Sequence, residues 1–193
     1  MNVLLINSGQ AYAQAEGKLN STLHDVAKKY FLASGFNTKE TLISAGYDID
    51  EEIEKFLWAD FIIYQMPAWW MSMPWETKKY IDEVYTFGYG KLYQNDGRTD
   101  ENPNGQYGTG GLLQGKKYML SVTWNAPEQA FNGADNFFEQ SGVDGIYFAF
   151  HKAQQFLGLS SLPTFMVNDV VKNPNVEQYI TNYKKHLAKT FGK

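Results

Sequence analysis

Short apolar runs alternate with helical stripes along the whole chain. The runs are rich in Val, Ile, Leu, Phe and Tyr and are bounded by Ser, Gly, Asn or Pro, which is typical of strands buried on both faces of a sheet. The predicted strands cover residues 2–7, 36–43, 60–65, 117–123 and 162–168. Because a helical pattern follows each run, the sequence predicts an α/β fold with a parallel sheet and helices on both faces.

The helical segments show apolar residues at intervals of three and four. The stripes run from Leu19 to Tyr30, Ile49 to Leu57, Thr77 to Tyr85, Val143 to Leu157 and Val176 to Leu187. We expect Pro74 to open the third helix, and Asn173 to cap the last one with Pro174 at its first position. Five strands in a chain of this length suit the flavodoxin-like strand order 2-1-3-4-5 better than a six-stranded dinucleotide fold.

The length indicates one domain spanning residues 1–193, without an internal repeat. The pattern of strands and helices stops over residues 88–111, where seven glycines accompany several Asn and Asp residues. Loops of this length inside a compact domain usually serve as lids or binding segments. Tyr107 lies in this Gly-rich insertion, and we expect it to fold over a ligand site as a lid.

Composition excludes several classes of function. The chain has no cysteine, which rules out a thiolate nucleophile, a disulfide framework and an iron–sulfur cluster, and it has only three scattered histidines, which disfavours a metal site. A net charge of -4 without a basic stripe disfavours nucleic acid as a partner. No apolar run approaches the length of a membrane span, so we expect no membrane insertion and a cytoplasmic protein.

Ligands of open α/β sheets bind beyond the carboxyl ends of the strands, where the strand order reverses. Three unusual loops are predicted to meet there, covering residues 8–22, 66–75 and 123–127. The first has Gly, Ser, Thr and Lys at a helix entrance, which suits a phosphate but also an ordinary capped helix. The second holds three tryptophans and three methionines, which suit a flat aromatic ligand, a subunit interface or packing beneath a neighbouring loop.

Other sites of chemistry are poorly supported. No Ser-His-Asp order, nucleophile elbow or matched carboxylate pair is evident, so hydrolase chemistry has no visible carrier. His151 lies on an apolar helical stripe beside Phe150, where a structural histidine is the simpler interpretation. The aromatic residues, 16% of the chain, therefore need an explanation in the loops as well as in the core.

Several motifs carry a resemblance that covers nearly the whole chain. They are Phe56-Leu57-Trp58-Ala59-Asp60, Gln65-Met66-Pro67-Ala68-Trp69-Trp70-Met71, Lys78-Lys79-Tyr80-Ile81-Asp82, Asp96-Gly97-Arg98-Thr99, Thr123-Trp124-Asn125-Ala126-Pro127 and Leu162-Pro163-Thr164-Phe165. With these motifs the chain resembles the modulator of drug activity B proteins, a bacterial branch of the NAD(P)H:quinone oxidoreductases with a flavodoxin-like fold.

The resemblance implies a homodimer with one FAD per subunit, in which NADPH reduces a quinone by two electrons through ping-pong hydride transfer. It places the FAD pyrophosphate and adenosine on Ala15, Glu16, Gly17, Lys18, Leu19, Asn20, Ser21 and Thr22. It places the isoalloxazine ring against Ala68, Trp69, Trp70, Met71, Thr123, Trp124, Asn125 and Ala126, with Tyr107 nearby as the candidate catalytic residue. Such a cofactor would explain why no acid–base pair is visible.

Two other functions fit the same residues. One is an FMN-dependent reductase of azo or nitro compounds, which differs in its cofactor. The other is a flavoprotein subunit that regulates a potassium-efflux system, which differs in having negligible turnover. The sequence leaves the physiological quinone and the choice between NADPH and NADH open.

Overall fold

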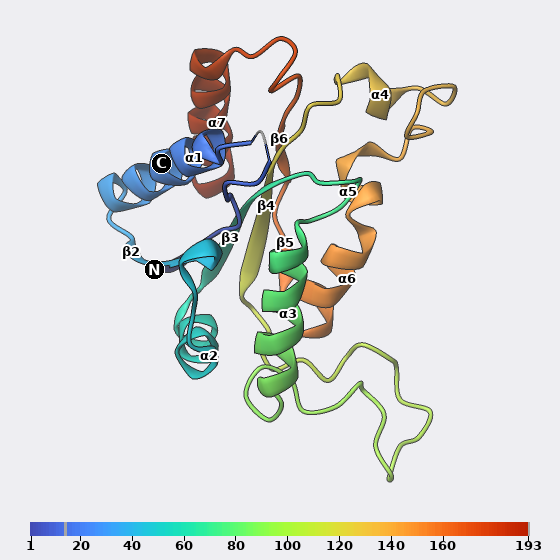
Figure 1. Ribbon diagram of the computed structural model, residues 1–193. Coiled ribbons are helices and arrows are strands. Elements are labelled where there is room, and N and C mark those ends of the chain that lie inside the picture. The colour runs from blue at the N-terminus through green and yellow to red at the C-terminus, as the bar shows by residue number, and fades with distance from the viewer. Residues whose placement is uncertain (14, 193) are drawn as a thin grey trace.

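The computed structural model describes residues 1–13 and 15–192 and has one parallel sheet at its centre (Figure 1). The strands are β1 Asn2–Asn7, β2 Asn37–Leu42, β3 Phe61–Pro67, β4 Lys117–Thr123, β5 Ser160–Ser161 and β6 Phe165–Val167. The strand order is β2-β1-β3-β4-β5, and β6 also pairs with β4. The predicted order 2-1-3-4-5 is therefore confirmed.

Helices cover both faces of this sheet (Figure 1). They are α1 Lys18–Ala33, α2 Ile49–Trp58, α3 Trp75–Phe87, α4 Gln129–Asn132, α5 Gly142–Ile146, α6 Phe148–Phe156 and α7 Val176–Phe191, with a 3-10 turn η1 at Ile43–Ala45. Residues of α1 and α7 share one apolar cluster, and residues of α2, α3 and α6 share the other. The sheet thus separates two cores.

Strand β1 shows why the apolar runs are continuous. Val3 and Leu5 pack into the core under α1 and α7, whereas Leu4 and Ile6 pack into the core under α2 and α3. Side chains of a strand alternate between faces, so a central parallel strand needs apolar residues at every position. The same alternation in β3 and β4 places the middle of the sheet out of contact with water.

The fifth sheet position differs from the prediction. A single strand over residues 162–168 was expected, but β5 and β6 pair with β4 separately and leave residues 162–164 between them. Pro163 lies in this break, and proline has no amide hydrogen to donate to a ladder. The prediction is therefore wrong in bounds, although it identified the correct neighbour of β4.

Two helix predictions also need correction. The stripe from Val143 to Leu157 is divided into α5 and α6 at Tyr147, whose backbone angles of -86° and 19° lie outside the helical range. Two glycines in α5 lower its helix propensity. The last helix begins later than expected, because Asn175 and not Asn173 is the N-cap and accepts a hydrogen bond from Gln178 N at 3.1 Å.

The Gly-rich insertion lies at the amino edge of the sheet, below α3 in Figure 1. It returns to β4 beside the end of α6, where Leu113 N donates to Leu157 O at 2.9 Å. Its two limbs are joined by hydrogen bonds from Gln94 N to Gly110 O and from Gly108 N to Asp96 O. The insertion therefore lies at the opposite end of the sheet from the three predicted site loops.

Candidate active site

The three predicted loops meet at the carboxyl edge, where backbone hydrogen bonds join each strand end to its neighbour. Ser8 N donates to Gln65 O at 2.8 Å, so the loop after β1 begins against the end of β3. Ala68 N donates to Thr123 O at 2.9 Å, so the loop after β3 begins against the end of β4. The predicted convergence of these loops is confirmed.

The first loop ends at an uncapped helix. Gly17 is the N-cap of α1 with a left-handed φ of 70°, and no side chain among the described residues caps the helix. A β-carbon on Gly17 would lie 3.0 Å from the carbonyl carbon of Gln10, so the loop folds closely back on the helix start. Free amides at a helix N-terminus attract anions through hydrogen bonding and the helix dipole.

Polar atoms without protein partners lie in the same loop. Within residues 1–13 and 15–192, Ser8 Oγ and Gln10 Nε2 are buried and form no hydrogen bond. Buried polar groups are rarely left unpaired in a folded protein, so these two atoms point to a ligand or ordered water. Lys18 adds an exposed ammonium group, which is paired with the Glu16 carboxylate in this structure. The loop therefore has the donors of a phosphate site.

The other expected phosphate residues occupy different environments. Ala15, Glu16, Lys18 and Ser21 are exposed, and Gly17, Leu19 and Thr22 are half-buried. The hydroxyls of Ser21 and Thr22 turn back to the carbonyls of Gly17 and Lys18 on α1. These residues surround the helix start, as the sequence indicates, but the Ser21 and Thr22 side chains already have helix partners.

Asn20 is different because it is buried in a chain of side-chain hydrogen bonds. Its Oδ1 accepts from Gln65 Nε2 at 2.9 Å, and its Nδ2 donates to Thr123 Oγ1 at 3.1 Å. Ser121 Oγ donates to Gln65 Oε1 at 2.7 Å and extends the chain into β4. We call Asn20, Gln65, Ser121 and Thr123 the amide network. It ties the first turn of α1 to the ends of β3 and β4.

Sequence reasoning missed Gln65 and Ser121. Both lie at inward positions of central strands, where the pattern predicts apolar residues, and both are at most 1% exposed. The sequence does show each of them as a polar residue within an otherwise apolar strand. A buried amide or hydroxyl requires a hydrogen-bond partner, so such a residue indicates a buried polar contact.

The second loop contains a tight turn in an unusual conformation. Trp69 N donates to Ser72 O at 2.8 Å, and Ser72 N donates to Trp69 O at 3.0 Å. The two residues between them, Trp70 and Met71, have positive φ values of 46° and 64°. Turns of this shape favour Asn and Gly, and the left-handed conformation costs other residues about 1–2 kcal/mol each. Strain of this kind is often found at binding sites.

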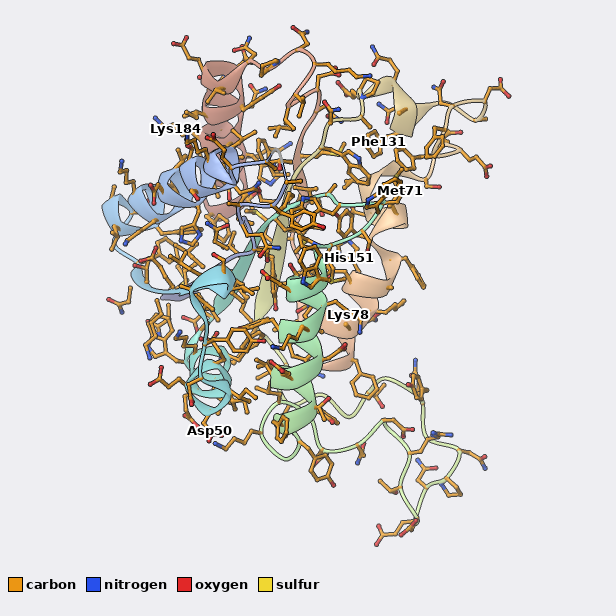
Figure 2. All side chains as sticks on the ribbon, viewed as in Figure 1. Asp50, Met71, Lys78, Phe131, His151 and Lys184 are labelled. Carbon is orange, nitrogen blue, oxygen red and sulfur yellow. The ribbon has the colours of Figure 1, made fainter. Side chains whose placement is uncertain are left out.

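This turn presents its side chains to solvent. The side chain of Trp70 is 95% exposed, and that of Met71 is 44% exposed. Met71 is labelled in Figure 2. A side chain as large as Trp is seldom so exposed without a ligand or partner to cover it.

An aromatic cluster connects the first two loops. The rings of Tyr12, Trp69 and Trp75 lie 4.9 to 5.2 Å apart, centroid to centroid. They border a cavity of about 670 Å³ that Ala68, Trp70 and Met73 also line. This volume and apolar lining are typical of small-molecule sites. The sequence-based prediction of site residues did not include Tyr12. An aromatic residue within a Gly- and Ser-containing loop at this sheet edge does indicate a ligand contact.

Comparisons with known proteins show the family of this chain. A family model described as a flavodoxin-like fold matches residues 1–190. The NADPH:quinone oxidoreductase MdaB of Haemophilus influenzae is 60% identical over 192 residues, which cover all of both chains. The chain belongs to the modulator of drug activity B family.

Solved structures share the fold of this family member. A putative quinone reductase from Klebsiella pneumoniae superposes with a TM-score of 0.77 at 25% identity, covering all of this chain and 84% of the other. The general stress protein 14 of Treponema denticola, solved with FMN, has a TM-score of 0.70 at 19% identity, covering 99% and 98% of the two chains. The second similarity shows the fold alone.

Trp124, which the resemblance places against the isoalloxazine ring, has its own ring in the core, and its contact with the cofactor stays a prediction. Trp124 is only 6% exposed and packs edge-on against Phe131, Phe138 and Tyr147. The loop bends inward directly after β4, because Trp124 N donates to Val167 O at 2.8 Å. Its side chain therefore belongs to the core.

The rest of the third loop is fixed to the segment after β6. Asn125 Oδ1 accepts from Val171 N at 3.1 Å, and Ala126 O accepts from Asn168 Nδ2 at 3.0 Å. Thr123 is buried, whereas Asn125 is exposed and Ala126 is half-buried. Of the four residues expected to face the ring, the structure thus leaves Asn125 and Ala126 accessible.

Tyr107 is not brought to the site loops of its own chain. Its ring lies 5.8 Å from Phe156 at the end of α6 and under the guanidinium of Arg98 at 5.6 Å. Both contacts are at the amino edge, so a lid closing over the carboxyl edge of the same chain is wrong. The physical reason is the position of the insertion, which joins α3 to the start of β4 and not to its end.

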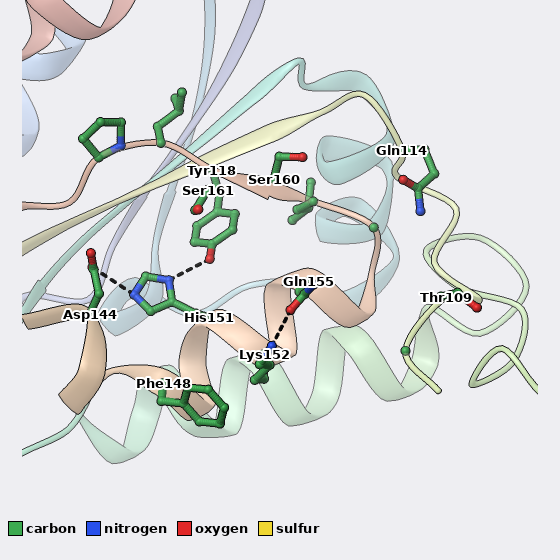
Figure 3. A pocket seen from close by; sticks show the side chains of 15 residues that line it. Thr109, Gln114, Tyr118, Asp144, Phe148, His151, Lys152, Gln155, Ser160 and Ser161 are labelled. Atoms are coloured by element: carbon green, nitrogen blue, oxygen red, sulfur yellow. Dashed lines mark hydrogen bonds and ion pairs between the residues drawn. The ribbon is translucent and has the colours of Figure 1, made fainter. Parts of the chain in front are cut away.

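A larger cavity of about 910 Å³ lies beside β5 and α6 (Figure 3). In it, Tyr118 OH and His151 Nδ1 are 2.7 Å apart, and His151 Nε2 lies 3.2 Å from Asp144 Oδ1. Among the described residues His151 Nε2 forms no hydrogen bond, so the interpretation of His151 as a structural histidine stays a prediction. The cavity is bordered by the amino end of β4 and lies apart from the three site loops.

Proposed function

We propose that this chain is a cytoplasmic, FAD-dependent NADPH:quinone oxidoreductase that works as a homodimer. One observation carries the proposal. An uncapped helix N-terminus with the unpartnered Ser8 hydroxyl lies at the same sheet edge as an exposed, strained aromatic turn, which is the arrangement that a nucleotide with a flat ring needs. The identity of 60% to the Haemophilus influenzae enzyme supports the same activity.

The residues present fit a flavin. The α1 amides, Ser8 Oγ and Lys18 are donors for phosphate oxygens, and the close approach of Gly9 to Asn20 leaves no room for a side chain there. A β-carbon on Gly9 would lie 2.5 Å from the β-carbon of Asn20. Ala68, Trp70 and Met71 offer apolar surface for a ring at the other end of the site.

A bound flavin supplies the two-electron hydride chemistry, which the protein side chains do not provide. The chain contributes binding and orientation. Amides at the start of α1 hold the phosphate, and the Trp69–Ser72 turn offers backbone amides and indole surface to the ring side. The Tyr12, Trp69 and Trp75 rings would shield a flavin ring bound in the cavity that they border. NADPH and the quinone would use this one exposed surface in turn, which is a ping-pong scheme.

Dimerisation would complete the site. The exposed Trp70 and Met71 need cover, and the expected role of Tyr107 depends on a second copy because the Tyr107 of the same chain lies at the opposite edge. Light scattering should give twice the chain mass of 22.0 kDa. A mass of one chain under dilute conditions would contradict the homodimer.

The activity is tested by anaerobic mixing of the purified protein with NADPH and then with a quinone. We expect the visible flavin band to bleach with NADPH and to return with the quinone, without oxygen. No bleaching would contradict the proposal.

Extraction of the cofactor and determination of its mass decide its identity. FAD is expected, and FMN would instead support the azo or nitro reductase function.

A further inference from the structure

Hydrogen bonds join the strained turn between Trp69 and Ser72 to other elements, in addition to the packing of Trp69 against Tyr12 and Trp75. At its base, Ala68 N donates to Thr123 O at 2.9 Å. At its far end, the carbonyl of Ser72 accepts two hydrogen bonds, one from Trp69 N at 2.8 Å and one from the hydroxyl of Tyr147 at 3.2 Å. Tyr147 is far from the turn in sequence, so this second bond fixes the turn to the α5–α6 side of the molecule.

Tyr147 is well suited to this role. It is 2% exposed, and its ring packs edge-on against Trp124 and Phe150. Burial raises the pKa of the Tyr147 hydroxyl, so the hydroxyl keeps its proton and remains a donor at any physiological pH. The ring is therefore immobilised in the core while its hydroxyl reaches out to the turn.

The backbone around Tyr147 is held on both sides. His151 Nε2 of α6 lies 3.2 Å from Asp144 Oδ1 of α5, across the break at which Tyr147 lies. Figure 3 shows this pair continuing from His151 to Tyr118 of β4, and Thr164 donates to Asp144 Oδ1 at 2.5 Å. The two helices that flank Tyr147 are thus tied to β4 and to the segment between β5 and β6.

We infer that Tyr147 is a positioning residue that holds the Trp69–Ser72 turn in its left-handed conformation by donating its hydroxyl hydrogen to Ser72 O. The effect of Tyr147 on flavin binding rests on the proposed function, because that function places the flavin ring against this turn. Tyr147 lies at the break between α5 and α6, and the contact between Asp144 and His151 spans that break.

The direct test is amide hydrogen exchange in Tyr147→Phe, which removes only the hydroxyl. The purified protein is used with whatever cofactor it retains. We expect exchange at the Trp69 and Ser72 amides to accelerate about fivefold, as the loss of one net hydrogen bond predicts. The matched control is Tyr30→Phe, because Tyr30 OH donates to Leu187 O at the same 3.2 Å but between α1 and α7. Exchange in the turn should be unchanged in that control.

A rescue separates positioning from general stability. Glycine adopts positive φ freely, so Met71→Gly should relax the turn and make the tyrosine hydroxyl dispensable. Adding Tyr147→Phe to Met71→Gly should then accelerate exchange less than twofold. Equal effects of Tyr147→Phe with and without Met71→Gly, or no effect of Tyr147→Phe on the turn, would overturn the inference.

The consequence for the site is measured on the bound cofactor. Tyr147→Phe should shift the visible absorption band of the flavin and weaken flavin binding roughly fivefold, whereas Tyr30→Phe should change neither. A spectrum and affinity equal to those of the unaltered protein would overturn the consequence. Protein that never holds flavin would contradict the proposed function, and the exchange result would still decide the role of Tyr147.

Discussion

Asn20 Nδ2 donates to Thr123 Oγ1 at 3.1 Å, and this bond joins the first turn of α1 to the last residue of β4. The two residues are 103 positions apart in the chain. One belongs to the loop that we assign to the phosphate, and the other belongs to the loop that we assign to the ring. The amide network therefore sets the spacing between the two parts of the proposed site.

Gln65 is the centre of that network, and its replacement should be severe. Gln65→Met keeps the volume but leaves Asn20 and Ser121 with buried polar atoms that lose a partner. We expect a loss of about 2–4 kcal/mol in the free energy of unfolding, measured with urea, together with weaker flavin binding. Gln155→Met is the control, because the side chain of Gln155 bonds only to the exposed Lys152 in the described structure, and it should cost less than about 0.5 kcal/mol.

The start of α1 should require glycine at position 17 for two reasons. A side chain there would crowd the backbone of Gln10, and the backbone angle is left-handed. Gly17→Ala places a methyl group 3.0 Å from the backbone of Gln10 at a φ of 70°. Gly35→Ala has a similar φ of 78° but meets nothing within 4 Å, so it reports the cost of the angle alone. We expect Gly35→Ala to lose about 1 kcal/mol of stability, and Gly17→Ala to lose more because of the added crowding. Only Gly17→Ala should weaken flavin binding in a fluorescence titration, and equal effects would contradict the close fit.

Replacement of two tryptophans in the site loops should have different effects on stability and activity. Trp124→Ala removes a buried ring and should cost about 3–5 kcal/mol of stability in a denaturation experiment. Trp70→Ala removes an exposed ring and should change stability by less than about 1 kcal/mol. Reduction of quinone by NADPH should nevertheless fall in Trp70→Ala. Wild-type rates in that variant would contradict its place in the site.

The pair of Asp144 and His151 predicts an acid-sensitive contribution to stability. The contact with His151 lowers the pKa of the Asp144 carboxyl below its usual value of about 3.9. A carboxyl with a lowered pKa stabilises the folded state above that usual value, and the contribution is lost as the pH falls through the lowered one. Asp144→Asn should therefore be less stable than the wild type at pH 7, and the difference should shrink below about pH 4.

The control for this measurement is Asp100→Asn, an exposed position in the Gly-rich insertion. It should match the wild type across the same pH range in thermal unfolding. A difference for Asp144→Asn that persists unchanged into acid would show that the carboxylate charge is not what stabilises the α5–α6 junction.

The sequence predicts those features that depend on periodicity. The strands 2–7 and 117–123 are correct to the residue because both faces are buried and the apolar run has no ambiguity. The helix beginning at Ile49 is correct because Asp48 caps it, accepting from Glu51 N at 3.0 Å. Local chemistry was sufficient in each of these cases.

Features that depend on contacts distant in sequence were not predictable in the same way. The side chain of Trp124 turns into the core because of its neighbours Phe131 and Tyr147, which a reading of the loop alone does not reveal. Tyr107 was expected at the ligand because its loop is long and rich in glycine, but loop composition carries no information about the sheet edge at which it lies. The partners of Gln65 and Tyr147 likewise come from other elements.

The break at Pro163 has a consequence for how the molecule behaves at high concentration. It leaves β5 with only Ser160 and Ser161, so that side of the sheet is too short to template a foreign strand. The opposite border is β2, where Lys39 and Glu40 place charges in the middle of the strand. Both margins of the sheet therefore resist edge-to-edge aggregation, even though its centre is almost wholly apolar.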